Sequence, residues 1–309
     1  MRKFERPTPR VILIFTMGRR IFLFLLTNLA VVLTLSVVLS VLGIGQYVGP
    51  GGLDIQALAL FCLVWGMGGA FISLQLSRWM AKRATGVKLV NGQTGQAELD
   101  WLHATVTRLT QQANLPMPEV GVYDSPEVNA FATGPSKSRS LVAVSSGLLR
   151  AMRRDEVEGV LAHEVAHIAN GDMVTMTLLQ GVMNAFVMFL ARIIAFALAS
   201  RGGSREERGG GSNFLVVFVL EIVLGIAGSL VTAWFSRQRE FRADHGGATL
   251  AGKDRMIGAL RRLAANRELV DPRHEALATA KINGSGRWMV FFSTHPPLEA
   301  RIAALERTT

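Results

Sequence analysis

The chain has 309 residues, half of them hydrophobic, and a formal net charge of +10. Its mean hydropathy of +0.31 is high for a soluble globular protein and favours a membrane protein. Its single cysteine, Cys62, excludes an intrachain disulfide, and the apolar run around it argues against a cysteine nucleophile. No basic stripe with interleaved aromatic residues accompanies the positive charge, so we expect no nucleic-acid partner.

Two uncharged runs of 22 residues, Ile21–Leu42 and Ile55–Leu76, each predict a transmembrane helix. A helix of that length spans about 33 Å, which matches a hydrocarbon core of about 30 Å. Two later runs, Met173–Leu198 and Phe214–Phe235, contain one charge each and are also long enough to span. The alternative for this second pair is a buried hairpin of core helices. We expect four membrane-spanning helices.

The single charges in the second pair of runs, Arg192 and Glu221, are matched in position. Arg192 lies seven residues before Ala199, which leads into the connecting loop, and Glu221 lies seven residues after Phe214. In an antiparallel pair of helices both charges then lie about 10 Å from the same membrane face. Because intramembrane charges are usually tolerated as pairs, we predict an ion pair between them.

Lysine and arginine predict the orientation of the chain in the bilayer. They are frequent in residues 1–20, absent from residues 43–54, and frequent again after the second span. By the positive-inside rule, the N-terminus and the segment after the second span face the cytoplasm. Four spans return the C-terminus to the same side. The role of residues 1–19 stays unassigned.

The remaining sequence is polar and predicts an α+β, mainly α, domain in two parts. The expected helices are Ala97–Ala113 and Asp155–Asn170, and the expected strands are Glu119–Tyr123 and Leu141–Ser145. The resulting division has four segments. These are a basic segment with spans one and two (1–83), a first catalytic part (84–172), a transmembrane hairpin (173–235) and a second catalytic part (236–309).

The sequence from His163 to His167 reads HEVAH and matches the pattern H-E-x-x-H. On a helix the two histidines lie about 40° apart, so their imidazoles can bind one divalent ion. Glu164 is placed one step round the helix, where it can take a proton from a metal-bound water. The apolar flanks predict a buried helix, so its polar residues need a functional reason.

A third metal ligand is expected downstream, at Glu240. A catalytic zinc has three protein ligands and one open position. Glu240 and Asp244 lie four residues apart on one predicted helix face, so Asp244 can accept a hydrogen bond from a ligand histidine. The alternative is that Glu240 is an exposed carboxylate among the arginines at 237, 239 and 242.

Several motifs in this order resemble HtpX-type membrane zinc proteases, which are related to the CAAX-prenyl endopeptidases. The motifs are LLTNLA at the start of the first span, NAFATG (129–134), HEVAHIANGDMVTM (163–176), SRQREFRAD (236–244) and THPPL (294–298). The resemblance covers nearly the whole chain from about Arg20.

The resemblance implies a gluzincin-like catalytic domain on transmembrane helices, in the bacterial inner membrane, with the catalytic domain and both termini cytoplasmic. It implies one Zn²⁺ per chain, held by His163, His167 and Glu240, with Glu164 as the base. The implied substrates are membrane-embedded or interfacial polypeptides, including damaged membrane proteins, and the implied activities include stress-related quality control and self-cleavage.

Further candidates follow from the same resemblance. His295 and Arg301, in THPPLEARI, are expected near the substrate carbonyl, where they could stabilise the oxyanion. The alternative is a structural Pro-Pro turn with its helix cap. Asn129, Ala130 and Phe131 are expected to form an edge strand that pairs with extended substrate, and the alternative is an ordinary turn.

Two other function classes compete with a protease. A catalytically silent membrane scaffold or chaperone would have no need of Glu164. A transporter using Arg192 and Glu221 as pathway charges fits poorly with four spans and a large polar domain. The order of motifs adds one expectation. Because HEVAH ends just before span three and Glu240 follows span four, we expect the metal site to lie beside the inner membrane surface.

Overall fold

The computed structural model describes residues 52–201, 210–270 and 295–307, together with residues 34, 37, 41, 48 and 49. The predicted span at Ile21–Leu42, with its LLTNLA motif, therefore lies almost entirely outside the described residues. A short hairpin of β1 (Val48–Gly49) and β2 (Gly52–Leu53) precedes the first long helix.

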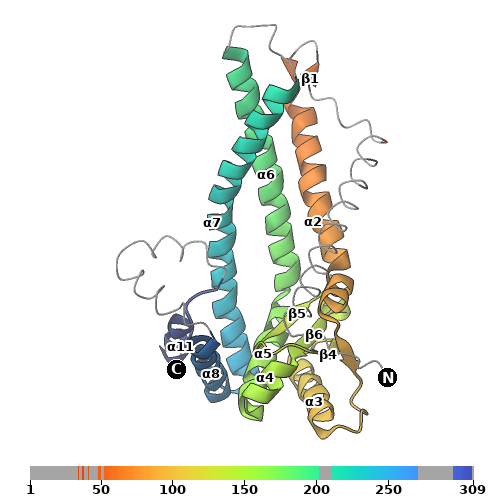
Figure 1. Ribbon diagram of the computed structural model, residues 1–309, viewed down its shortest axis with the longest axis vertical. Helices are drawn as coiled ribbons and strands as arrows, with labels where there is room; N and C mark the ends of the chain where they lie inside the picture. The colour runs from red at the N-terminus through yellow and green to blue at the C-terminus, as the bar shows by residue number, and fades with distance from the viewer. Residues whose placement is uncertain are drawn as a thin grey trace, which may run out of the picture.

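Three long helices dominate the molecule: α2 (Ile55–Thr85), α6 (Asp172–Arg201) and α7 (Gly210–Ala251). Each is long and apolar enough to cross a membrane. They run side by side with α6 between the other two (Figure 1). Three of the four predicted spans are thus present. The helices are longer than the predicted runs: α2 continues from Leu76 to Thr85, and α7 continues without a break past Phe235 into the polar segment that carries Glu240.

Small residues allow α2 and α6 to pack closely. A Cβ atom added to Gly66 on α2 would lie 2.6 Å from the backbone nitrogen of Ala185 on α6. One added to Gly181 would lie 2.9 Å from the sulfur of Met67. Such close backbone approach is how membrane helices gain van der Waals contact without a hydrophobic driving force.

The predicted ion pair is confirmed. An Nη1 atom of Arg192 on α6 lies 2.6 Å from Oε1 of Glu221 on α7. The same Arg192 nitrogen donates to the carbonyl of Met188, and its guanidinium lies 5.6 Å from the ring centroid of Phe61 on α2. The charge pair and the contact of Arg192 with Phe61 therefore connect all three long helices.

A four-stranded sheet lies at one end of the long helices (Figure 1). It contains β3 (Lys88–Val90), β4 (Glu119–Tyr123), β5 (Ala130–Thr133) and β6 (Leu141–Ser145), in the order β3-β4-β6-β5. Strands β4 and β6 have the predicted bounds and pair in parallel, while the other pairs are antiparallel. All five residues of β6 are buried, as expected for an inner strand covered on both faces.

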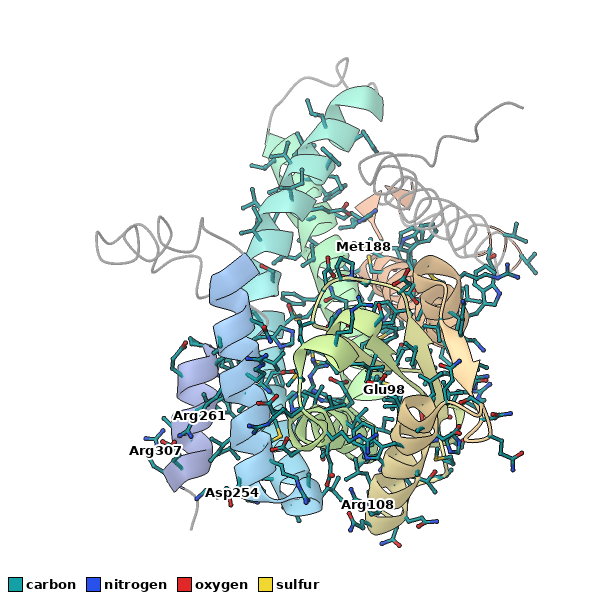
Figure 2. All side chains as sticks on the ribbon, turned by 60° about the horizontal axis from the view of Figure 1, so that its bottom comes forward. Glu98, Arg108, Met188, Asp254, Arg261 and Arg307 are labelled. Carbon is teal, nitrogen blue, oxygen red and sulfur yellow. The ribbon has the colours of Figure 1, made fainter. Side chains whose placement is uncertain are left out.

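The remaining helices lie at this end of the molecule: the first three contact the sheet, and the last two pack on each other and on α7. They are α3 (Ala97–Gln112), α4 (Ser146–Ala151), α5 (Arg154–Asn170), α8 (Lys253–Val270) and α11 (Leu298–Arg307), with a 3₁₀ turn at Lys137–Arg139. The main core joins Leu102 and Val106 of α3 to Val142 of β6 and Leu161 of α5. Side chains crowd this end of the molecule (Figure 2). The α+β, mainly α, class is confirmed in this form.

Candidate metal and catalytic site

Helix α5 carries the HEVAH motif through the middle of the core. It starts with a hydrogen bond of 2.8 Å from the Arg153 backbone N–H to the Glu156 carboxylate, which satisfies a donor at the helix start. It ends at Gly171, whose φ of 69° places it in the left-handed region that favours glycine. Leu161, Val165 and Ile168 are fully buried, so the helix is held by packing rather than by its exposed surface.

His163, His167 and Glu240 meet in one buried cluster. The two Nε2 atoms lie 3.1 Å apart. Glu240 reaches both of them from α7, with oxygen–nitrogen separations of 3.5 Å to His163 and 3.4 Å to His167. Only 1% of Glu240 is exposed, so the alternative of an exposed carboxylate is wrong. One arginine of that alternative, Arg239, does donate to Glu240, at 3.2 Å.

The other ring nitrogen of each histidine is held by a buried carboxylate. Asp244 lies one turn beyond Glu240 on α7, and its Oδ1 is 2.9 Å from Nδ1 of His163. Oδ2 of Asp172 is 2.7 Å from Nδ1 of His167. Carboxylates in these positions hold both Nδ1 atoms in the N–H form and leave both Nε2 atoms free to bind an ion.

Burial and hydrogen bonding oppose each other in setting the pKa of the two histidines. Burial alone lowers the pKa of His167, but the bonds to Asp172 and Glu240 outweigh it and raise the pKa to about 9. Burial likewise lowers the pKa of His163, and its bonds to Asp244 and Glu240 reverse the direction and raise it. Without an ion, the site is therefore arranged to hold positive charge.

Glu164 follows His163 on α5 and is half-buried. Its charge is close enough to help raise the pKa of both histidines and of Arg301. It is not one of the three clustered residues whose side chains could hold a metal ion. This position beside the cluster, rather than within it, is what a proton acceptor requires.

The segment from His295 to Pro297 and α11 close one side of the cluster. Nδ1 of His295 lies 2.9 Å from Glu240 Oε2, and most of the His295 side chain is exposed. Arg301 on α11 is buried, and its Nε donates to Asp244 at 2.7 Å while an Nη atom forms a second bond to the same carboxylate. Both residues come to the site as expected, but the guanidinium of Arg301 is bound to Asp244.

The segment that contains Asn129, Ala130 and Phe131 is an edge strand and not an ordinary turn. Ala130 and Phe131 open β5, which pairs only with β6 among the described strands. Asn129 is fixed just before it, since its backbone N–H donates to Ser145 Oγ and its carbonyl accepts from Ser145 N–H. Helix α5 packs against this strand. The unpaired edge is open to a further extended chain.

Asp172 is a site residue that the sequence reading missed. Its signal was an acidic residue directly after the Asn170-Gly171 helix end, where the chain leaves α5 and enters α6. In the sequence analysis, Asp172 is only the last residue of the first catalytic part, before the third predicted span. The structure shows a buried side chain that bonds to a ligand candidate.

The three clustered side chains fit a divalent ion. One candidate ligand atom from each lies within 4.8 Å of the others. Separations of 3.1 to 3.5 Å between such atoms suit a tetrahedral ion with bonds of about 2.0–2.2 Å. Two imidazoles and one carboxylate form a ligand set typical of zinc, and the aspartates behind the histidines complete the outer contacts that such sites need.

Residues 96–309 match the family model described as peptidase family M48. A "Protease HtpX homolog" from Bacillus licheniformis is 55% identical over 298 residues, covering 94% of this chain and 99% of that protein. A "Protease HtpX" from Aeromonas salmonicida is 52% identical over 293 residues, covering 93% of this chain and 99% of that protein.

A solved structure is similar to the whole described architecture. The crystal structure of S. mikatae Ste24p matches with a TM-score of 0.64 at 18% sequence identity. The match covers 96% of this chain, which spans 66% of the length of that protein. At this identity the similarity concerns the fold alone.

Proposed function

The chain belongs to peptidase family M48, among the HtpX proteases, and on that premise we propose that it is a membrane-bound, zinc-dependent endopeptidase for damaged or misfolded membrane proteins. Membership of this family makes the chain a metallopeptidase. The proposal adds the ion, the residue roles, the class of substrate and the cellular location.

One observation carries the proposal. His163, His167 and Glu240 bring their ligand atoms within 4.8 Å of one another in a buried site. The buried carboxylates of Glu240, Asp244 and Asp172 surround the two imidazoles, so the arrangement favours a positive charge at its centre. Zinc is the proposed ion, one per chain, on the basis of this ligand set.

The proposed mechanism uses the residues around the cluster. A bound zinc ion supplies Lewis acidity that lowers the pKa of a water molecule and polarises the peptide carbonyl. Glu164 accepts the proton of the attacking water and delivers it to the leaving amine, as a general base and then a general acid. Asp244 and Asp172 keep the two histidines in the tautomer that leaves Nε2 available.

Substrate positioning is proposed for the residues at the rim. An extended polypeptide adds to the open edge of β5 at Asn129, Ala130 and Phe131, so that backbone hydrogen bonds align it over the site. His295, exposed and within 2.9 Å of Glu240, donates to the developing oxyanion. Arg301 supports this region through Asp244, to which it is bound.

The proposed location is the bacterial inner membrane, with the catalytic domain and both termini in the cytoplasm. Two features support it. Basic residues flank the cytoplasmic ends of the spans, as the positive-inside rule requires. The cluster is directly continuous with the membrane helices, because α6 begins at Asp172 and α7 contains Glu240. A site beside the bilayer favours membrane-embedded or interfacial substrates, and also a second copy of the chain in self-cleavage.

The test is Glu164→Gln in full-length protein purified in detergent. We expect bound zinc to stay near one per chain while proteolysis and self-cleavage fall by about 10²- to 10⁴-fold, because only the proton acceptor is lost. Asp155→Asn, an exposed change on the same helix and outside the cluster, is the control and should retain activity. Unchanged proteolysis in Glu164→Gln would overturn the mechanism. Intact wild-type protein that holds zinc and cleaves no membrane substrate would favour a scaffold.

A further inference from the structure

A groove with a volume of about 710 Å³ lies between α2, α6 and α7, inside the predicted membrane-spanning part. Helix α6 forms its floor, because it packs against both other helices (Figure 1). Met188, labelled in Figure 2, and Glu221 line its outer end, at the Arg192–Glu221 ion pair. Met176 and Thr232 line the opposite end, towards the catalytic domain.

Two amide side chains lie on the floor of this groove. Gln180 and Asn184 are one turn apart on α6, and both are exposed. They lie about 12 Å and 18 Å along the helix from Asp172, within the predicted membrane span. Nε2 of Gln180 donates to Oδ1 of Asn184 at 2.8 Å. Among the described residues, Nδ2 of Asn184 and Oε1 of Gln180 have no hydrogen-bond partner.

Lipid tails cannot satisfy those free amide atoms. An unpaired polar group in hydrocarbon costs several kcal/mol, so exposed amides at this depth are expected to serve a polar ligand. The opposite wall is shaped for close approach. A Cβ atom built on Gly225 of α7 would meet nothing within 4 Å. Small residues allow membrane helices to approach closely, and amide side chains form hydrogen bonds between them.

The inner end of the groove leads to the catalytic domain. Met176 lies four residues after Asp172, which bonds to His167, and Thr232 lies two turns before Glu240. On α2, Ser73 lines the groove and the nearby Gln75 accepts a hydrogen bond of 3.1 Å from Arg139, in the turn after β5. This end of the groove therefore lies on the side of the catalytic domain, next to the turn that follows β5.

We propose that this groove binds a transmembrane segment of the polypeptide substrate. Gln180 and Asn184 bond to a polar side chain or to unpaired backbone groups of that segment. This inference rests on the proposed protease function and adds how the substrate is selected. An intact apolar helix has no free polar groups to offer, whereas an unwound or misassembled span does. A distance of about 12–18 Å corresponds to four or five extended residues, so cleavage is expected within a few residues of the bilayer.

Photocrosslinking identifies the occupant. The probe, p-benzoylphenylalanine, replaces Asn184 or, as a control, Val182, which is exposed on α6 outside the groove. Both are built into the inactive Glu164→Gln protein, reconstituted with a single-span test protein that has an asparagine in mid-span. Crosslinks to the test protein from position 184 but not from 182 support the proposal. Crosslinks from 184 only to residues 1–47 of the same chain, or to a second copy, overturn it.

A functional test fills the groove. Gly225→Phe adds bulk into its open space, and Val223→Phe adds similar bulk to an exposed face of the same helix. We expect both Gly225→Phe, which blocks the groove, and Asn184→Leu, which removes a hydrogen bond, to lower kcat/KM for the single-span protein. The expected loss is about 3- to 30-fold, the range that corresponds to one hydrogen bond between membrane helices. Hydrolysis of an unstructured water-soluble peptide should not change, and Val223→Phe should change neither reaction.

The outcomes separate this inference from the function on which it rests. Equal losses on both substrates would mean that the groove supports the catalytic site, and no loss on either would mean that substrate does not use it. Both results overturn the proposal while leaving the protease function intact. A wild-type protein that hydrolyses neither substrate would instead overturn the protease function itself.

Discussion

Nδ1 of His167 lies 2.7 Å from Oδ2 of Asp172, the first residue of the membrane helix α6. Only Gly171 separates that helix from the end of α5. The carboxylate is buried and also lies 3.7 Å from Arg242 on α7. One side chain therefore ties a candidate metal ligand to the start of a membrane span, and the position of the span in the bilayer sets the position of the site.

Replacement of Asp172 by Asn should weaken metal binding more than it weakens folding. The amide can no longer hold His167 in the required tautomer as an ionised carboxylate does, and losses of this kind are about 10- to 100-fold in metal affinity. Competition with a chelator of known zinc affinity measures it. Asp155→Asn, an exposed change on α5, the helix that carries His167, is the control. Equal affinity in wild type and Asp172→Asn would show that the bond does not support the site.

The stabilisation that zinc gives should grow with pH. The pKa of His167 is raised to about 9 in the absence of metal. A raised folded pKa contributes stability below the unfolded value of about 6.5, and that contribution is lost as the pH rises through about 9. Zinc needs the neutral rings, so protons compete with it over the same range.

Thermal unfolding in detergent checks this pH dependence. The difference in Tm between zinc-loaded and chelator-treated protein should widen steadily from pH 6.5 to pH 9. Asp172→Asn removes the main bond that raises the pKa of His167. The difference in Tm between the zinc-loaded and chelator-treated forms of this variant should therefore vary less with pH. A difference that is constant across the range would contradict the proton competition.

The local structure around the site was predictable because its signals are local. The HEVAH spacing places both histidines on one helix face, and the bounds of β4 and β6 follow from short apolar runs between turn residues. The Arg192–Glu221 pair was also predictable, since two charges in long apolar runs have few other partners. In each case a single local arrangement of the residues satisfies the hydrophobic periodicity or avoids the cost of an unpaired charge.

What could not be predicted depends on contacts between distant segments. Spacing alone could not distinguish a buried Glu240 from an exposed one, because the distinction is made by the packing of α7 against α5. Strand β3 and helix α8 lack a strong pattern of their own. Arg301 was expected to support the site, but its partner Asp244 could not be named in advance, because the contact spans 57 residues and no local pattern encodes it.

Breaking the Arg192–Glu221 pair should destabilise the membrane part strongly. Removing one partner leaves the other charge unpaired in a low-dielectric setting, at a cost of about 3 kcal/mol. We expect Glu221→Gln to lower the free energy of unfolding in detergent by this order, and the double change with Arg192→Gln to recover part of the loss. Glu98→Gln, on the exposed part of α3, controls for a general loss of charge. Additive effects of the two substitutions would contradict the pair.

A single alanine inserted after Phe235 should abolish metal binding without unfolding the chain. Helix α7 is continuous from Gly210 to Ala251, so the insertion turns everything beyond it by about 100° and shifts it by about 1.5 Å. Glu240 then leaves the cluster, and so does Asp244. The same alanine inserted after Gly211, in the first turn of the helix, moves the start of α7 and leaves Glu240 in place.

Zinc content and helical circular dichroism separate the two insertions. The insertion after Phe235 should keep its helix signal and lose stoichiometric zinc, while the insertion after Gly211 keeps both. The reason is that α7 is both a membrane span and the carrier of the third ligand, so a rotation within it cannot be absorbed by a flexible joint. Full zinc content after the first insertion would mean that Glu240 is not a ligand, and that two histidines with another group complete the site.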